Sequence, residues 1–246
     1  MIGPFRKRTW ATGSSRAACG TDEAAAREAA RSLLDARVTW GGETFGVALS
    51  GGRIAASFYG CLVAQSARRG VDLRKVDYFW ADERCVPPDH ADSNYRTARE
   101  TLLGPLGVAP ERVHRLEGER EPAEAVVRAV SDWRRWQALQ HSAPAAPQVV
   151  VLGVGEDGHV ASLFPGNLGA DLRVDAPFAT VVGPKPPPQR LTMTYPMLWQ
   201  APLVIVLATG EGKGAVVDAA LAGSPDLPLT RVLAGRRARL THLFTR

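Results

Sequence analysis

The chain has 246 residues, of which 45% are hydrophobic and 22% are charged, a composition typical of one globular domain with a substantial core. It contains no run of about 18 apolar residues, so we expect no membrane-spanning helix. Its three cysteines, an odd number without a C-x-x-C pair, favour a reducing cytoplasm and argue against a structural zinc site.

The formal charge of +5 at pH 7 and the isoelectric point near 9.4 suit an anionic partner. The densest basic run is "GRRAR", residues 235–239. The other cations are scattered and no aromatic residues alternate with them, so a solvated basic face is favoured over a nucleic-acid site. A small anionic substrate fits the charge as well. We expect a monomer, with a weak dimer as the alternative.

Residues 1–20 begin with basic side chains but have no apolar segment behind them, so they do not form a secretory signal. We expect them to be a loosely ordered extension in front of a single domain over residues 21–246. Together with the cysteine count, this favours a cytoplasmic protein.

Along this domain, helical patterns alternate with apolar runs. The patterns predict helices over residues 21–38, 54–70, 93–103, 121–140 and 212–223. The apolar runs predict strands over residues 44–50, 75–82, 148–155, 178–183, 202–209 and 240–245. Strands of continuous Val, Ile and Leu separated by helices predict a doubly wound α/β fold, a mainly parallel sheet with helices on both faces.

Local signals refine these helices. Thr21 is a candidate N-cap with acidic residues in the following turn, and Gly70 is a candidate end of the second helix. In the fourth helix, we expect the stripe of Val126, Val130 and Trp133 to face the core.

Ligands of doubly wound folds bind at the carboxyl ends of the strands. The loops expected there carry most of the polar residues of interest: residues 50–52, 82–84, 155–159 and 209–213.

The glycines of one such loop, Gly153, Gly155 and Gly158, match the dinucleotide-binding pattern G-x-G-x-x-G. A dinucleotide loop opens a long helix, yet "FPG" at residues 164–166 would end a helix here after about two turns. The carboxylates inside the loop would repel a pyrophosphate, and Asp175 precedes the next apolar run, whereas the ribose-binding acid ends a strand. We therefore expect no dinucleotide.

His159 is the candidate catalytic residue of this loop. It lies at a strand end on a glycine-rich turn, beside Asp157, which can orient its ring. Imidazole, with an ordinary pKa of about 6.5, is the natural general base at neutral pH. The alternative is a histidine with a structural role only.

The turn Ser50–Gly51–Gly52 follows another strand. It is not a nucleophile elbow, because position 48 is alanine and the pattern G-x-S-x-G fails. The exposed backbone N–H groups of such a turn can bind a phosphate, with Arg84 and Lys213 supplying the positive charge. The alternative is a tight turn that binds nothing.

The run "WADER" places Asp82 at the end of a third strand. Asp82 could accept hydrogen bonds from sugar hydroxyls, whereas Glu83 should point away from it. A salt-bridged turn without a ligand is the alternative.

Five segments together resemble a known family. In chain order they are "ALSGG", "FWADERCVPPDHADSNYRTARETLL", "LGVGEDGHVASLFPG", "PPPQRLTMTYPML" and "LATGEGKGAVV". They are similar to the successive motifs of the 6-phosphogluconolactonases, over about residues 21–221. The resemblance implies hydrolysis of 6-phospho-D-glucono-1,5-lactone in the oxidative branch of the pentose phosphate pathway, with neither a metal nor a nicotinamide cofactor.

Carried onto this chain, the family's general base falls on His159, in the loop that holds Gly155, Asp157 and Gly158. Its phosphate-binding elements fall on the turn at residues 50–52, Arg84 and Lys213. Asp82 and Arg190 match positions that line the family's site.

The chain departs from the family pattern directly after Gly52. Arg53, Ile54 and Ala55 stand where hydroxyl residues and a proline are usual, so two phosphate donors are lost. The guanidinium of Arg53 could replace them, since it would lie in the first turn of the next helix. The C-terminal "LTHLFTR" also lacks the family's usual tryptophan and aspartate.

Two other functions compete with this one. An aminosugar-phosphate deaminase/isomerase shares the "SGG" and "GH" landmarks, but would be expected to show "DEY"-like and "FNEP"-like stretches where this chain has "DER" and "SLFP". The departure at residues 53–55 also suggests a non-catalytic sugar-phosphate binder or a lactonase that uses another sugar acid.

Overall fold

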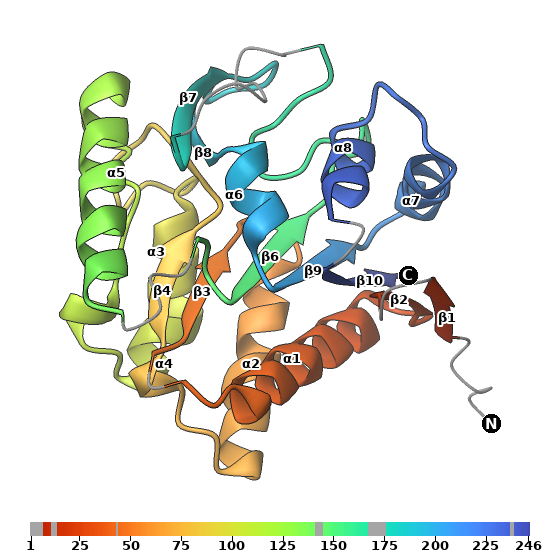
Figure 1. Ribbon diagram of the computed structural model, residues 1–246, viewed down its shortest axis with the longest axis horizontal. Coiled ribbons are helices and arrows are strands. Elements are labelled where there is room, and N and C mark those ends of the chain that lie inside the picture. Colours follow the sequence, from red (N-terminus) through yellow and green to blue (C-terminus); the bar gives the residue numbers. More distant parts are fainter. Residues whose placement is uncertain (1–6, 11–13, 43, 141–144, 167–175, 237–238) are drawn as a thin grey trace.

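The computed structural model describes residues 7–10, 14–42, 44–140, 145–166, 176–236 and 239–246. A large sheet forms the centre of the molecule, in the strand order β1-β2-β10-β9-β6-β3-β4 (Figure 1). Its strands are β1 (Lys7–Trp10), β2 (Ser14–Ala18), β3 (Gly46–Leu49), β4 (Asp77–Trp80), β6 (Val149–Gly153), β9 (Leu203–Ala208) and β10 (Leu240–Thr245). All neighbours are parallel except the outer pair β1 and β2.

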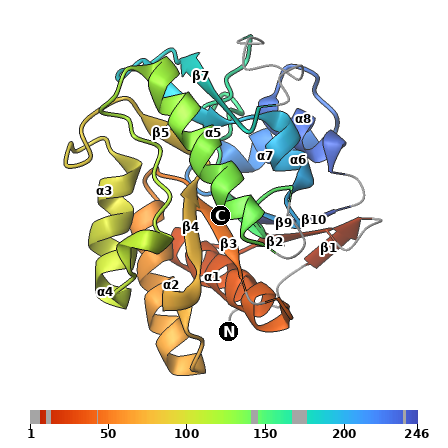
Figure 2. The same ribbon diagram turned by 60° about the vertical axis from the view of Figure 1, so that its left-hand side comes forward.

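Helices cover both faces of this sheet. On one face lie α1 (Asp22–Thr39) and α2 (Ala55–Arg69), and on the other lie α5 (Pro122–Ala138), α6 (Tyr195–Gln200), α7 (Lys213–Leu221) and α8 (Pro228–Gly235) (Figures 1 and 2). The short helices α3 (Asn94–Ala98) and α4 (Gly104–Leu106) run on either side of a π-helical turn, Arg99–Leu103. The predicted doubly wound α/β fold is confirmed. None of the helices in the described segments is long and apolar enough to cross a membrane.

The predicted helix ends are confirmed at both positions named. Thr21 is the N-cap of α1 and accepts a hydrogen bond from Ala24 N at 3.1 Å. Gly70 ends α2 in the left-handed conformation, with φ of 64°. The stripe predicted for α5 is confirmed, because Trp133 is buried and Val126 and Val130 are partly buried against the core. Ala125, Ala129 and Trp136 are buried as well and were not predicted.

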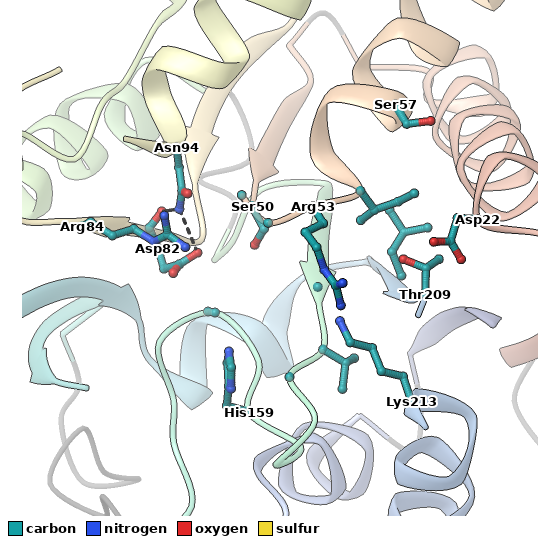
Figure 3. Close-up of a pocket in the computed structure, with 18 of the residues that line it drawn as sticks. Asp22, Ser50, Arg53, Ser57, Asp82, Arg84, Asn94, His159, Thr209 and Lys213 are labelled. Atoms are coloured by element: carbon teal, nitrogen blue, oxygen red, sulfur yellow. Dashed lines mark hydrogen bonds between the residues drawn. The ribbon is translucent and has the colours of Figure 1, made fainter. Parts of the chain in front are cut away.

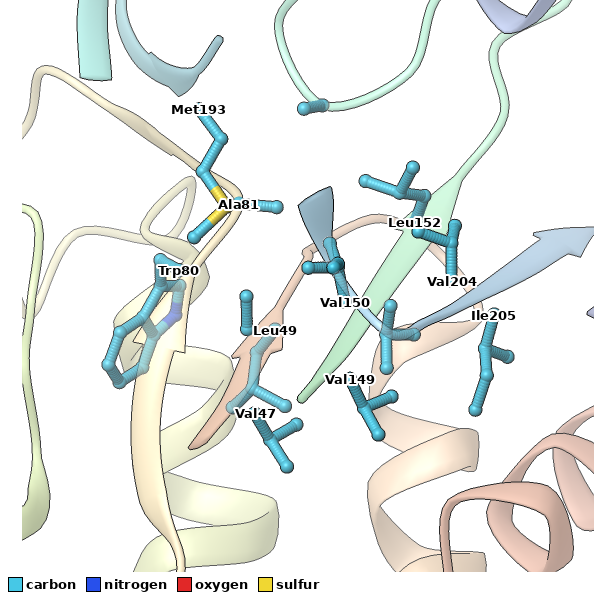
Figure 4. Packing of buried hydrophobic residues seen from close by; sticks show 14 of the residues in the cluster. Val47, Leu49, Trp80, Ala81, Val149, Val150, Leu152, Met193, Val204 and Ile205 are labelled. Atoms are coloured by element: carbon cyan, nitrogen blue, oxygen red, sulfur yellow. The ribbon is translucent and has the colours of Figure 1, made fainter. Parts of the chain in front are cut away.

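The core lies between the sheet and its helices. Every residue of β3, β4 and β9 is buried, which explains their uninterrupted apolar sequences. Figure 4 shows side chains from neighbouring strands, among them Val47, Val149 and Ile205, in one continuous layer.

The N-terminal segment differs from expectation. Ser14–Ala18 forms β2, which pairs in parallel with residues 242–245 of β10, and Ala17 is only 5% exposed. The prediction of a loosely ordered extension over residues 1–20 is therefore wrong for this strand, while residues 1–6 and 11–13 lie outside the described part. β2 satisfies backbone groups that β10 would otherwise leave unpaired.

A second, antiparallel sheet was not predicted. It has the order β5-β8-β7, with β5 (Asp82–Arg84), β8 (Gln189–Met193) and β7 (Phe178–Val182). The segment "DER" is thus itself a strand, and the run 178–183 belongs to this small sheet. Since β5 starts two residues after β4, the small sheet stands directly above the carboxyl end of the large one.

The basic run at residues 235–239 is not simply a solvated face. Arg236 is 2% exposed, and its guanidinium donates to the carbonyl oxygens of Leu198, Ala201 and Leu240. Burial, assisted by nearby Arg239, lowers the pKa of Arg236 to about 9. This side chain ties the end of α6 to the start of β10.

His114 packs against β4 and lies between two carboxylates. The ring of His114 stacks on Phe79 at 4.4 Å, and its Nδ1 lies 2.7 Å from Asp132 Oδ2, with Nε2 3.8 Å from Asp77 Oδ1. Burial alone would lower the pKa of His114, but the hydrogen bond to Asp132 and the charges of Asp132 and Asp77 outweigh it, so the pKa is raised.

We expect the replacement His114→Gln to destabilise the protein more in acid than in base. A raised folded-state pKa stabilises the fold fully below the unfolded value of about 6.5, and this contribution is lost as the pH rises through the folded pKa. The free energy of unfolding, measured with urea, should fall by about 2 kcal/mol at pH 6 and by clearly less at pH 9. The same change at exposed His90 is the control. Equal losses at both pH values would contradict this role for His114.

Candidate functional site

A cavity of about 700 Å³ opens at the carboxyl ends of β3, β6 and β9 (Figure 3). Ten of the twelve predicted site residues line it: Ser50, Gly51, Gly52, Arg53, Asp82, Arg84, Gly155, His159, Arg190 and Lys213. The other two, Asp157 and Gly158, are in the same loop as His159 but do not line the cavity. The fold places these residues together because parallel strands end at the same edge of the sheet.

The glycine turn after β3 forms one wall of the cavity. Ser50 is 7% exposed, and its Oγ has no hydrogen-bond partner among the described residues. Gly52 has φ of 98°, a conformation that favours glycine. Contrary to expectation, Arg53 precedes α2 by two residues, because α2 begins at Ala55. Its guanidinium nevertheless points into the cavity (Figure 3).

The loop after β6 presents His159 to the cavity. Asp157 Oδ1 lies 2.6 Å from His159 Nδ1 and also accepts the His159 backbone N–H at 3.1 Å. Burial would raise the pKa of Asp157, but these hydrogen bonds and the charge of His159 outweigh it and lower the pKa. Asp157 therefore remains an ionised acceptor that orients the ring, and leaves Nε2 free for other partners.

The same loop excludes a dinucleotide site of the usual kind. After Gly155 the chain makes turns and isolated bridges up to Gly166, with no helix. The helix N-terminus that would hold a pyrophosphate is missing from these residues. Asp175 lies outside the described residues.

The N-terminus of α8 supports the loop. The backbone N–H of Leu229 donates to Gly158 O at 3.1 Å, and Gly158, with φ of 78°, packs on Leu227. Gly155 lies so close to the ring of His159 that a Cβ at this position would overlap it. The glycines of this loop are needed for close packing around the histidine.

The small sheet supplies the opposite wall. Asp82 Oδ2 accepts a hydrogen bond from Ser162 Oγ at 2.8 Å. Arg84 on β5 and Arg190 on β8 are partners in the strand register. Arg190 donates to the backbone oxygens of Pro187 and Lys185, while Arg84 Nε has no partner among the described residues.

Two pairs of cations thus face the cavity. Burial lowers the pKa of Lys213, and the charge of Arg53 lowers it further, although Glu156 and Asp22 oppose this. Burial lowers the pKa of Arg190 as well, and the charge of Arg84 adds to it. The charged forms of Lys213 and Arg190 are stabilised when an anion binds beside them, so this cavity is suited to a small anionic ligand.

Asn94 is a cavity residue that was not among the predicted site residues. The N-cap of α3 is Ser93, and Asn94 lines the cavity while donating from Nδ2 to Asp82 O at 2.9 Å. Eight residues separate "DER" from "SNY" in the chain, and only the packing of α3 on β5 shows that they meet.

Among the residues that the structure describes, no group of three or more His, Cys, Asp or Glu side chains could hold a metal ion.

Replacing Gly155 with Ala should displace His159 and lower any activity that depends on it by about a hundredfold, the usual contribution of a positioned general base. Gly60→Ala is the matched control, because Gly60 lies in α2 with open space around its Cα. This control should retain full activity and gain about 1 kcal/mol of stability. Full activity in Gly155→Ala would show that the close packing on His159 is unimportant.

The fold and the cavity define an α/β protein with a cation-lined cavity at its strand ends, which is suited to a small anion. Residues 20–241 match the family of glucosamine-6-phosphate isomerases and 6-phosphogluconolactonases, and the chain belongs to this family. It is 34% identical over 232 residues to the 6-phosphogluconolactonase of Streptomyces coelicolor, covering 90% of this chain and 87% of the relative. With the human 6-phosphogluconolactonase it shares 38% identity over 192 residues, 77% of this chain and 73% of the relative.

Solved structures agree with this membership. The 6-phosphogluconolactonase of Trypanosoma brucei superimposes with a TM-score of 0.78 at 26% identity, covering 96% of this chain and 97% of that chain. A monomeric glucosamine-6-phosphate deaminase matches with a TM-score of 0.75 at 20% identity, covering 94% and 97%. The second likeness concerns the fold alone.

Proposed function

We propose that the protein hydrolyses 6-phospho-D-glucono-1,5-lactone to 6-phospho-D-gluconate, a step of the oxidative branch of the pentose phosphate pathway. The observation that carries this proposal is the Asp157–His159 pair facing a cavity lined by two pairs of cations. The curated relatives that share the fold over most of their length are named for the same activity.

In this mechanism His159 is the general base. A water molecule attacks C1 of the lactone while His159 Nε2 takes one of its protons, and the resulting imidazolium is stabilised by Asp157. Collapse of the tetrahedral intermediate breaks the bond between C1 and the ring oxygen. His159 then returns the proton to that departing oxygen, so the enzyme ends unchanged. Because a δ-lactone is an activated ester, no side chain has to act as nucleophile.

The cationic walls supply binding and electrostatic stabilisation. The backbone N–H groups of Gly51 and Gly52, with Arg53 and Lys213, form the part of the cavity suited to the phosphate. Arg84, a predicted phosphate contact, lies with Arg190 in the opposite wall, where their positive charge adds to the binding of the anionic substrate. Asp82 is suited to accept a hydrogen bond from a sugar hydroxyl.

An aminosugar-phosphate deaminase is the second candidate, supported by the shared fold. A lactonase for a different sugar acid, or a non-catalytic binder, is the third, supported by Arg53–Ala55 in place of the usual hydroxyl residues. Proton release from freshly generated phosphogluconolactone, corrected for spontaneous hydrolysis and compared with ammonia release from glucosamine 6-phosphate, separates the three.

His159→Asn should lower kcat for the phosphorylated lactone by at least about a hundredfold, because it removes the base while keeping the size of the side chain similar. Calorimetry should still detect binding of 6-phosphogluconate. Turnover near that of the unmodified protein would remove His159 from the mechanism.

Arg53→Ser restores the type of residue usual at this position. If Arg53 contacts the phosphate, KM for the phosphorylated lactone should rise about fivefold, because a charge-assisted hydrogen bond is lost. Hydrolysis of unphosphorylated gluconolactone is the matched control and should not change. Equal effects on both substrates, or none on either, would exclude the phosphate contact.

A further inference from the structure

Glu83 is the central residue of β5, and its carboxylate points away from the cavity into the protein. It is 2% exposed, yet its hydrogen-bond partners among the described residues are all uncharged groups. Oε1 accepts the backbone N–H groups of Arg84 and Asn94, both at 2.8 Å. Oε2 accepts the Tyr95 N–H at 2.8 Å and the Ser93 hydroxyl at 3.2 Å. Burial raises the pKa of Glu83 to about 7, against the opposing effect of these hydrogen bonds.

These hydrogen bonds connect Glu83 to the cavity through Asn94. The Asn94 amide donates to the backbone oxygen of Asp82 at 2.9 Å. Its Oδ1 packs against Gly51 so closely that a Cβ at Gly51 would overlap it. Asn94 is 2% exposed and therefore joins the glycine turn after β3 to β5 with little freedom to move.

Only a carboxylate satisfies all of these donors. Each oxygen of Glu83 accepts a backbone N–H group, and a backbone N–H cannot reverse its role. A glutamine would place its NH₂ group against one of these donors and leave it unpaired. These donors therefore favour the ionised form of Glu83, which burial opposes, although the side chain does not line the cavity.

We propose that Glu83 is a positioning residue, which fixes Asn94 and the backbone of Arg84, and through them the wall formed by Gly51 and Asp82. The inference rests on the proposed function, because its consequence is measured on the binding of the phosphorylated lactone. Glu83 differs in this from Asp82 and Arg84, which line the cavity themselves.

The test is the variant Glu83→Gln. Displacement of the wall should raise KM for the phosphorylated lactone about tenfold, as expected when hydrogen bonds to a charged group are lost, with kcat within about twofold. A purely structural role would act differently. It would reduce the fraction of folded enzyme, which lowers the apparent kcat and leaves KM unchanged.

Glu121→Gln is the matched control. The Glu121 carboxylate also accepts a backbone N–H at a helix start, from Glu124 at 3.0 Å in α5, but it does not line the cavity. This variant should keep the KM of the unmodified protein. Thermal unfolding of both variants separates loss of stability from loss of binding.

Asn94→Ala is the second variant, and it leaves the backbone donors to Glu83 in place. It should raise KM to a similar extent, and the double variant should show little further increase, because residues that act through one another are not additive. Additive effects, or an unchanged KM in either single variant, would overturn the proposal.

Binding of 6-phosphogluconate, measured by calorimetry, distinguishes failure of the proposed function from failure of the positioning role of Glu83. If the unmodified protein binds this compound but does not turn over the lactone, the proposed function fails, and a tenfold weaker affinity in Glu83→Gln would still support the positioning role. Equal affinities in the two proteins would exclude that role.

Discussion

The pairing of β6 between β3 and β9 determines where the cavity forms. Val149 is opposite Val47 on one side and Leu203 on the other, so the three strands run in parallel and end at one edge. The glycine turn, the histidine loop and the segment before α7 leave the sheet at that edge. Because the side chains of these strands are buried on both faces, a shift in register would disrupt the core before it disturbed the cavity.

The small sheet adds a pair of arginines to the cavity wall. Antiparallel pairing of β5 with β8 places Arg84 opposite Arg190, although 105 residues separate them in the chain. Two neighbouring guanidinium groups repel each other, and this arrangement is unfavourable without an anion. The fold therefore brings two mutually repelling charges together at the cavity, as is common at functional sites.

The fold class, the ends of α1 and α2 and most site residues could be predicted from the sequence, because each has a local cause. Continuous apolar strands indicate burial on both faces, Thr21 and Gly70 are ordinary helix ends, and glycines mark turns. The positions that could not be predicted depend on distant partners. β2 has no alternating pattern, and it forms because β10 offers an edge. Arg236 is buried because carbonyl groups of two segments, the end of α6 and the start of β10, accept its hydrogen bonds.

Asn94 and Glu83 illustrate the same limit within the site. The alternation of side chains along a strand correctly placed Glu83 on the side opposite Asp82. It could not show that the N-terminus of α3 packs against Glu83 and donates to it from three consecutive residues, Ser93, Asn94 and Tyr95. The periodicity of a sequence describes a single strand or helix. These contacts arise where two elements, α3 and β5, pack against each other.

The strand β2 also matters for how the chain can be shortened. A boundary drawn at residue 20, as the sequence alone suggests, would remove the strand that pairs with β10. The freed edge would present the apolar run "LTHLFT" with an open row of backbone donors and acceptors. Such an edge is a template for intermolecular pairing, and the pairing of β2 with β10 covers it.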